Sequence, residues 1–106
     1  MTRTLTLKAS AVPDGGARVV RMDDHLALAV FRVGETFYAI DNRCPHKGGP
    51  LGEGPLDGTT VTCPWHRFTI DVRTGENGRV PGLRVRTFPV ERDGDELRIT
   101  VGEGRA

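Results

Sequence analysis

Apolar and polar residues alternate in several short stretches of the chain, which is the pattern of a β-strand with one buried face. Residues 4–7 read Thr-Leu-Thr-Leu, and residues 36–40 combine aromatic and β-branched side chains. Residues 26–33 are apolar at most positions and therefore predict a strand that is buried on both faces. The same reasoning predicts further strands at residues 19–20, 60–62, 68–72, 84–91 and 97–101.

Turn-forming residues separate these stretches, and none of the stretches has the period of an amphipathic helix. Residues 13–16 read Pro-Asp-Gly-Gly, and residues 34–35 read Gly-Glu between two predicted strands. The Asp-Gly pair at residues 93–94 predicts a hairpin between the last two strands. We therefore predict an all-β fold, a small sandwich or barrel, with residues 1–106 forming one domain.

The composition argues against several classes of protein. Hydrophobic residues make up 37% of the chain and charged residues 27%, which is typical of a folded domain. The net charge is +1 and no basic stripe is present, so a nucleic-acid partner is not expected. The longest apolar run, residues 26–31, is far shorter than a membrane span, and the first residues lack the apolar core of a signal peptide. The sequence predicts a soluble cytoplasmic protein that does not enter a membrane.

The character of the sequence changes between residues 42 and 73. This segment is rich in glycine and proline, and it contains both cysteines and two of the three histidines. Such a segment is a poor hydrophobic core, but its glycines allow backbone N–H groups to approach a bound anion closely. We interpret it as two loops that project from the sheet and are joined by the strand at residues 60–62.

Cysteine and histidine alternate in these loops with the spacing of metal ligands. Cys44-Pro-His46 lies in the first loop, and Cys63-Pro-Trp-His66 follows after sixteen residues in the second. Without a secretion signal, this pattern favours metal ligation over a disulfide. Two thiolates and two imidazoles bind either one tetrahedral zinc ion or a 2Fe–2S cluster, with the cysteines on one iron and the histidines on the other. Each loop contributes one ligand of each kind, which differs from the zinc-finger order of two cysteines followed by two histidines.

The two loops resemble those of the Rieske family. The matching residues are Cys44-Pro-His46-Lys-Gly-Gly-Pro-Leu51 and Cys63-Pro-Trp-His66, followed by Asp71 and Thr74-Gly75. The resemblance implies three small antiparallel sheets in a stack, with one 2Fe–2S cluster at the tip of two loops. It also implies that the two cysteines ligate the buried iron and the two histidines ligate the outer iron.

The chain departs from the high-potential branch of that family. That branch carries an extra cysteine in each loop, joined in a disulfide, and hydroxyl residues two and four positions after the second histidine. This chain has no third cysteine and carries Phe68 and Ile70 at those two positions. Because fewer hydrogen bonds to the cluster stabilise the added electron less, we predict a midpoint potential at the low end of the Rieske range.

The inventory of residues predicts an electron carrier and not an enzyme. A mononuclear iron oxygenase site needs two further histidines and a carboxylate, but only His25 is left, which we interpret as a surface residue. The chain has no Gly-x-Gly-x-x-Gly fingerprint for a nicotinamide or flavin of its own. The resemblance implies a Rieske-type ferredoxin that carries single electrons from a flavin-dependent reductase to a terminal oxygenase.

Two alternatives stay open at this point. The first is the small subunit of an NAD(P)H-dependent nitrite reductase, whose large subunit is then the electron acceptor; Lys47 after the first histidine is frequent in that group. The second is a zinc-binding structural module, which predicts one zinc ion and a colourless protein. Trp65 lies between two predicted ligands, and we interpret it either as an exposed docking residue or as a shield against water. The sequence does not determine the physiological donor, the acceptor or the oligomeric state.

Overall fold

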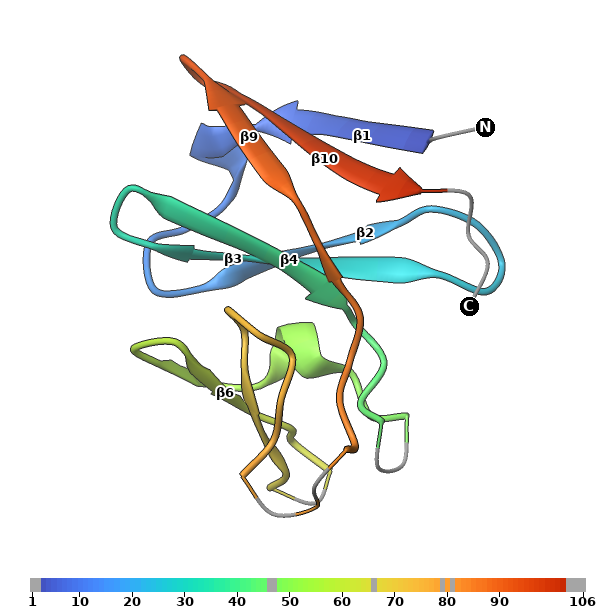
Figure 1. The fold of residues 1–106 in the computed structure, drawn as a ribbon. Helices are drawn as coiled ribbons and strands as arrows, with labels where there is room; N and C mark the ends of the chain where they lie inside the picture. Colours follow the sequence, from blue (N-terminus) through green and yellow to red (C-terminus); the bar gives the residue numbers. More distant parts are fainter. Residues whose placement is uncertain (1–2, 46–47, 66, 79, 81, 103–106) are drawn as a thin grey trace.

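Three antiparallel β-sheets lie one above another in the computed structural model, which describes residues 3–45, 48–65, 67–78, 80 and 82–102 (Figure 1). The first sheet has the strand order β1-β10-β9, the second β2-β3-β4-β8 and the third β5-β6-β7. The strands are β1 (Arg3–Lys8), β2 (Ala17–Arg21), β3 (Ala27–Val33), β4 (Thr36–Asp41), β5 (Leu56–Asp57), β6 (Thr60–Thr62), β7 (Thr69–Asp71), β8 (Thr87–Phe88), β9 (Val90–Asp93) and β10 (Glu96–Gly102). The prediction of an all-β fold with three small sheets is confirmed.

Most predicted strands are present with small differences at their ends. The stretches predicted at residues 4–7, 19–20, 26–33, 36–40, 60–62, 68–72 and 97–101 correspond to β1, β2, β3, β4, β6, β7 and β10. Two short 3-10 helices, η1 (Ala9–Ala11) and η2 (Leu51–Glu53), and the short strand β5 were not predicted. In the described part of the chain, no helix is long and apolar enough to cross a membrane.

Strand β3 lies in the middle sheet and supplies two hydrophobic cores. Leu28 and Val30 pack in the core that the middle sheet shares with the first sheet. Ala29 and Phe31 pack in the core that it shares with the third sheet. All four side chains are completely buried, because successive side chains of a strand point to opposite faces and each face is covered. The prediction that residues 26–33 are buried on both faces is confirmed.

The third sheet packs the glycine-rich segment against the middle sheet. Val61 of β6 lies opposite Leu56 of β5 on one side and Ile70 of β7 on the other. Val61 and Ile70 pack in one buried cluster with Phe31 and Ile40 of the middle sheet. Both cysteines belong to the same cluster. The second loop therefore starts and ends in a sheet that contributes to a hydrophobic core, and the first loop leads from the middle sheet to this third sheet.

Three of the hairpins use a two-residue turn that begins with glycine. Gly34, Gly58 and Gly94 each have a φ of +62° and connect β3 to β4, β5 to β6 and β9 to β10. Glycine with a positive φ at the first central position is what a type II′ hairpin turn requires. The predicted hairpin between the last two strands is confirmed, but Asp93 already belongs to β9, so the turn residues are Gly94 and Asp95.

The prediction of one continuous strand over residues 84–91 is wrong. Within this range, β8 pairs with β4 in the second sheet, whereas β9 pairs with β10 in the first sheet. Pro89 lies between them and has no N–H group for a strand ladder, although its carbonyl accepts a 3.0 Å hydrogen bond from the N–H of Thr100. The proline therefore marks the point where the chain passes from one sheet to the next.

Candidate metal centre

The two cysteines lie in two loops at one end of the molecule, opposite the first sheet (Figure 1). The first loop follows β4, contains Cys44 and is closed by an antiparallel bridge between Arg43 and Pro50. The second loop connects β6 to β7 and contains Cys63. The prediction of two loops that project from the sheet and are joined by the strand at residues 60–62 is confirmed.

The backbone around both cysteines has the same hydrogen-bond pattern. In the first loop, the N–H of Cys44 donates to the carbonyl of Gly49 (2.9 Å), and the N–H of Gly48 donates to the carbonyl of Cys44 (2.8 Å). In the second loop, the N–H of Cys63 donates to the carbonyl of Phe68 (2.7 Å), and the N–H of Arg67 donates to the carbonyl of Cys63 (2.9 Å). Each cysteine is thus bonded to the residues four and five positions after it.

The two loops also share one unusual backbone conformation. The fourth residue after each cysteine has a positive φ, which is +78° for Gly48 and +55° for Arg67. Arg67 is the one residue other than glycine with a positive φ in the described part of the chain. Because this conformation is unfavourable for a residue with a Cβ, the closed loop around Cys63 imposes it on Arg67. Two segments that differ in sequence are therefore held in equivalent shapes around a cysteine.

Both thiols are buried, and the loops meet at one of them. Cys44 is 2% exposed and Cys63 is 1% exposed, and they are not joined in a disulfide. A Cβ added to Gly49 would lie 2.6 Å from the Sγ of Cys63, so the backbone of the first loop lies against the thiol of the second. The tertiary structure thus brings the two predicted thiol ligands into one apolar site.

The predicted histidine ligands lie outside the described residues. This applies to His46 and His66, and also to Lys47, the residue that is frequent in nitrite reductase small subunits. Within the described ranges, no group of three or more histidine, cysteine or acidic side chains gathers in one place. The structure therefore positions the cysteine half of the predicted site, and the assignment of the histidine half stays a prediction from the spacing of the motif.

The surroundings of the two thiols suit a cluster of soft, sulfur-bound metal ions. Thiolates are the ligands that iron–sulfur clusters and zinc prefer, and burial beside Leu51 and Phe68 keeps water away from them. Gly49 leaves the space beside Cys63 free of any Cβ, as a backbone that lies close to a bound cluster requires. The donor set and its glycine-lined approach fit a 2Fe–2S cluster.

Asn42 stabilises the first loop, although we did not single it out from the sequence. Its side-chain oxygen accepts a 2.7 Å hydrogen bond from the N–H of Gly52, and its carbonyl accepts a 2.8 Å bond from the N–H of Leu51. Both bonds join the start of the loop to η2 at its far end. Asparagine directly before a loop is a known turn signal, because its side chain can hydrogen-bond nearby backbone groups.

A tight turn holds the residues after β7 in place. The carbonyl of Asp71 accepts hydrogen bonds from the N–H groups of Thr74 (3.2 Å) and Gly75 (2.7 Å). Gly75 has a φ of +82°, and a Cβ there would collide with the carbonyl of Val85, whose N–H donates to Gly75 at 2.9 Å. The residues Asp71 and Thr74-Gly75, which form part of the family resemblance, thus bind the segment around Val85 to the third sheet.

Arg73 forms an ion pair with Asp71 beside this turn. The guanidinium of Arg73 donates to the carboxylate at 3.0 and 3.2 Å, and the backbone N–H of Arg73 donates to it at 2.9 Å. The side-chain hydrogen bond from Arg73 is the main cause that lowers the pKa of the Asp71 carboxyl, and the backbone hydrogen bond adds to it. Together they outweigh partial burial, which raises the pKa of that carboxyl. The carboxylate therefore stays ionised at neutral pH and keeps the turn in place.

Four further residues discussed from the sequence are placed by the structure. Phe68 and Ile70, at the positions where hydroxyl residues occur in the high-potential branch, are 3% and 0% exposed and pack with the cysteines. Trp65 is 59% exposed, which supports the interpretation of a docking residue, although its ring also lies against Gly49. His25 is exposed, as predicted for a surface histidine.

Comparison with known proteins gives the same picture. A family model described as the Rieske [2Fe-2S] domain matches residues 2–89. The 3-phenylpropionate/cinnamic acid dioxygenase ferredoxin subunit of Shigella boydii serotype 4 (strain Sb227) is 35% identical over 107 aligned residues, which cover 99% of each chain. A chain from a solved complex of reduced oxygenase and oxidized ferredoxin in carbazole 1,9a-dioxygenase is 36% identical with a TM-score of 0.80, over 89% of this chain and 91% of that one.

A nitrite reductase subunit has a similar fold at lower sequence identity. The putative NADH-dependent nitrite reductase small subunit of Mycobacterium tuberculosis aligns with a TM-score of 0.83 over 95% of this chain and 96% of that one. The two sequences are only 19% identical, so this similarity concerns the fold. The fold therefore does not distinguish dioxygenase ferredoxins from nitrite reductase small subunits. The sequence of this chain is more similar to the dioxygenase ferredoxins named above than to this nitrite reductase subunit.

Proposed function

The chain belongs to the Rieske [2Fe-2S] domain family, with close similarity to ferredoxin subunits of dioxygenases, and from this premise we propose that it carries single electrons from a flavin-dependent reductase to a terminal oxygenase. The observation that carries the proposal is the pair of equivalent loops that bring Cys44 and Cys63 into one buried site. The full-length similarity to a dioxygenase ferredoxin subunit supports the choice of partner class.

The proposed ligands of one 2Fe–2S cluster are Cys44, His46, Cys63 and His66. When bound, such a cluster accepts and releases one electron. The protein contributes buried thiols, backbone bonds that set the position of each cysteine, and an apolar surround that excludes water from the sulfur atoms. Burial and hydrogen bonding around the sulfur atoms are the means by which a protein sets the potential of such a site.

The proposal assigns catalysis to another chain. Apart from the four proposed ligands, the sequence retains one histidine, His25, and no glycine-rich fingerprint for a nicotinamide or flavin. A cluster on loops at one end of a small domain can come close to a larger protein, so that the electron crosses only a short distance. The cytoplasmic location predicted from the sequence stays a prediction, as does the identity of the donor.

Metal analysis and spectroscopy test the proposal directly. Protein purified without oxygen is expected to contain two iron atoms and two acid-labile sulfides per chain, to be red-brown and to bleach on reduction by one electron. Cys44→Ser, His46→Ala, Cys63→Ser and His66→Ala are each expected to lose this spectrum. His25→Ala is the matched control, because it removes the third histidine and should leave the spectrum unchanged. One zinc ion per chain with no colour would refute the cluster and favour the structural module.

A nitrite reductase subunit is the second candidate, supported by the fold match over 95% of the chain. The two candidates differ in the enzyme that consumes the electron. The reduced protein should be reoxidised during turnover by an aromatic-ring oxygenase with its substrate and oxygen, and not by a sirohaem nitrite reductase with nitrite. Faster reoxidation by the nitrite system would reverse the assignment while leaving the cluster intact.

A further inference from the structure

Positive charge is concentrated in the part of the chain that carries the two loops. Residues 42–86 contain seven lysines and arginines and four acidic residues, a net charge of +3. The rest of the chain has a net charge of −2. The overall charge of +1 therefore conceals an excess of positive charge in the segment that carries the two loops, which lies at one end of the molecule (Figure 1).

Most of the arginines near the loops have no acidic partner. Arg73 is paired with Asp71, but Arg43, Arg67, Arg84 and Arg86 make no ion pair with a described carboxylate. The first sheet differs, because its described arginines Arg3, Arg92 and Arg98 are all paired with acidic residues. An exposed guanidinium without a carboxylate partner can form an ion pair with a carboxylate on another molecule.

These arginines lie next to the cysteine loops. Arg67 belongs to the second loop, and Arg43 directly precedes Cys44, with its Nε close to Gly48. Arg84 and Arg86 are exposed on either side of Val85, which packs in the same buried cluster as both cysteines. The carbonyl of Arg86 also accepts a 3.0 Å hydrogen bond from the N–H of Asp41, at the start of the first loop. Arg43 and Arg67 thus lie in the loops themselves, whereas Arg84 and Arg86 lie beside them, where Arg84 donates to the carbonyl of Thr74 at 3.5 Å and Arg86 stacks on Phe88 at 5.0 Å.

Exposed apolar residues accompany the charges. Trp65 is 59% exposed and Val80 is 46% exposed, and both belong to segments at the loop end of the molecule. An exposed tryptophan with neighbouring arginines is the composition that protein interfaces favour at their energetic centre. Single exposed apolar residues are common, so the argument depends on their position beside the unpaired arginines.

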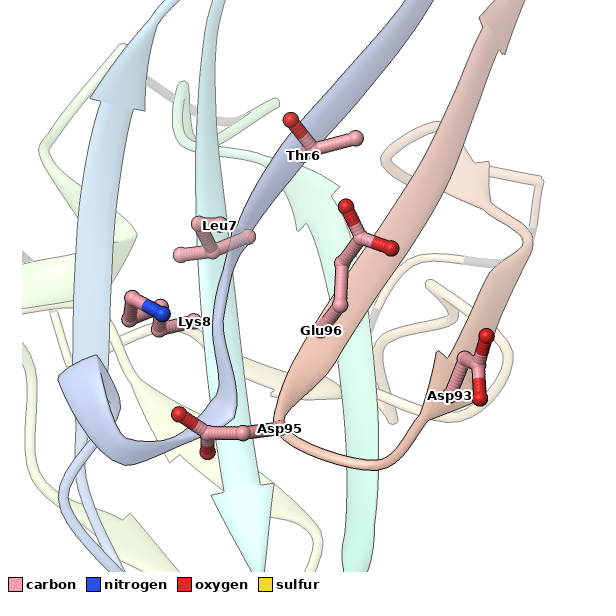
Figure 2. A pocket seen from close by; sticks show the side chains of 6 residues that line it. All are labelled: Thr6, Leu7, Lys8, Asp93, Asp95 and Glu96. Atoms are coloured by element: carbon pink, nitrogen blue, oxygen red, sulfur yellow. The ribbon is translucent and has the colours of Figure 1, made fainter.

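The opposite end of the molecule carries no net charge, because β1, β9, β10 and the turn between β9 and β10 contain four basic and four acidic residues. Asp93, Asp95 and Glu96 lie around the turn between β9 and β10, at the edge of a hollow that Lys8 also lines (Figure 2). Residues 91–96 contain four acidic residues and one arginine, a net charge of −3. Asp95 is occupied by hydrogen bonds from the N–H and hydroxyl of Ser10, both 3.0 Å long. We assign no ligand to this hollow, because its acidic residues are balanced by basic residues of the same sheet.

We propose that the loop end is a basic docking surface, formed by Trp65, Arg43, Arg67, Arg84 and Arg86, and that it binds a redox partner whose docking face is rich in aspartate and glutamate. The proposal rests on the proposed electron-carrier function and adds the charge of the partner. Two ferric ions, two sulfides and two thiolates have no net charge together, so the oxidised cluster does not cancel the arginines. The excess of positive charge in the loop segment, opposite a first sheet without net charge, orients the molecule as it approaches an acidic face, with the loops first.

Small oxidants of known charge test the sign of this surface. The chemically reduced holoprotein is mixed in a stopped-flow instrument with ferricyanide, a trianion, or with the tris(phenanthroline)cobalt(III) cation, each of which takes one electron. The rate constant with ferricyanide is expected to fall as salt is added, and the rate constant with the cobalt complex is expected to rise or stay constant. A ferricyanide rate that increases with salt would overturn the proposal.

Matched charge variants show which arginines accelerate the reaction with ferricyanide. The double variant Arg84→Gln/Arg86→Gln is expected to react with ferricyanide about fivefold more slowly at low salt. The control Arg92→Gln/Arg98→Gln removes the same charge from β9 and β10 and is expected to keep the rate of the natural sequence. Midpoint potentials of all three proteins are measured to exclude a change in driving force. Equal slowing in both variants, or in neither, would contradict a basic surface at the loops. A preparation that never bleaches on reduction would instead refute the electron-carrier function.

Discussion

The backbone of Gly49 lies directly against the thiol of Cys63, and a Cβ at Gly49 would be 2.6 Å from that Sγ. The two residues belong to different loops and are fourteen positions apart in the sequence. The same hypothetical Cβ would also approach the Trp65 ring at 3.1 Å. Access to the buried thiol therefore depends on a glycine that the other loop supplies.

Gly49→Ala is expected to impair retention of the cluster. The added methyl group must displace either the Sγ of Cys63 or the backbone of the first loop, and such overpacking destabilises proteins by about 1–3 kcal/mol. Iron and sulfide per chain, measured on freshly purified protein, should fall well below those of the natural sequence. Gly78→Ala is the control, because a Cβ there meets no atom within 4 Å. Full iron and sulfide content in Gly49→Ala would show that the contact is not needed.

Gly54→Ala is expected to destabilise the whole loop end. Its Cβ would collide with the backbone carbonyl oxygen of Thr62, the residue before Cys63, and a backbone atom cannot move aside as a flexible side chain can. The free energy of unfolding should fall by about 3 kcal/mol, as measured by chemical denaturation with far-UV circular dichroism. The same Gly78→Ala control applies. A loss below about 1 kcal/mol would mean that the backbones separate easily there.

Arg67 and Gly48 occupy equivalent positions but should respond in opposite directions to substitution. Arg67→Gly relieves an unfavourable backbone conformation, which is worth about 1–2 kcal/mol, and part of this gain is offset by the greater freedom of glycine in the unfolded chain. Gly48→Ala introduces the same unfavourable conformation and should lower the thermal midpoint. Thermal unfolding of both variants checks this. A lower midpoint for Arg67→Gly would show that contacts of the arginine side chain outweigh the backbone effect.

The midpoint potential is expected at the low end of the Rieske range, about −150 mV, and not at the upper limit of about +300 mV. Phe68 and Ile70 are buried beside the cysteines and offer no hydroxyl group to a sulfur atom. Fewer hydrogen bonds leave the reduced cluster less stabilised and lower the potential. Voltammetry of the holoprotein measures this value. A potential near the upper limit would require donors other than those hydroxyl groups.

The Asp71–Arg73 pair predicts how stability depends on pH. Hydrogen bonds from Arg73 lower the pKa of the Asp71 carboxyl, so the folded state holds the ionised form more firmly than the unfolded state does. The pair therefore contributes its full stability above the unfolded pKa near 3.8, and the contribution is lost as the pH falls through the lowered value. Because Arg73 is largely exposed, the contribution is below about 1 kcal/mol.

Asp71→Asn should therefore reduce the thermal midpoint by a constant amount between pH 8 and pH 5. The difference from the natural sequence should shrink below pH 4, as the carboxyl of the natural protein becomes protonated. Because both proteins carry the same cluster, any acid lability of the cluster cancels in the difference between their thermal midpoints. A difference that already changes between pH 8 and pH 5 would mean that the carboxyl is not held in its ionised form.

Much of the fold followed from local patterns. Alternation placed β1, aromatic and β-branched residues placed β4, and the continuous apolar run placed β3 with both faces buried, since a central strand must fill two cores. Pro89 was the main local signal that we did not use. A proline in a predicted strand of eight residues indicated a break, and the structure has the change of sheet at that residue.

By itself, the sequence determined the identity and order of the proposed ligands, because Cys-x-His and Cys-x-x-His are local spacings that do not depend on packing. It also determined the glycine positions that make the hairpin turns, because a positive φ is a property of one residue. Only the tertiary structure decided which atoms from the two loops meet. The contact between Gly49 and Cys63 and the placement of Arg84 and Arg86 beside the loops join residues that are far apart in the chain. Such contacts are set by how three sheets fill a common core, and no pattern along one strand encodes them.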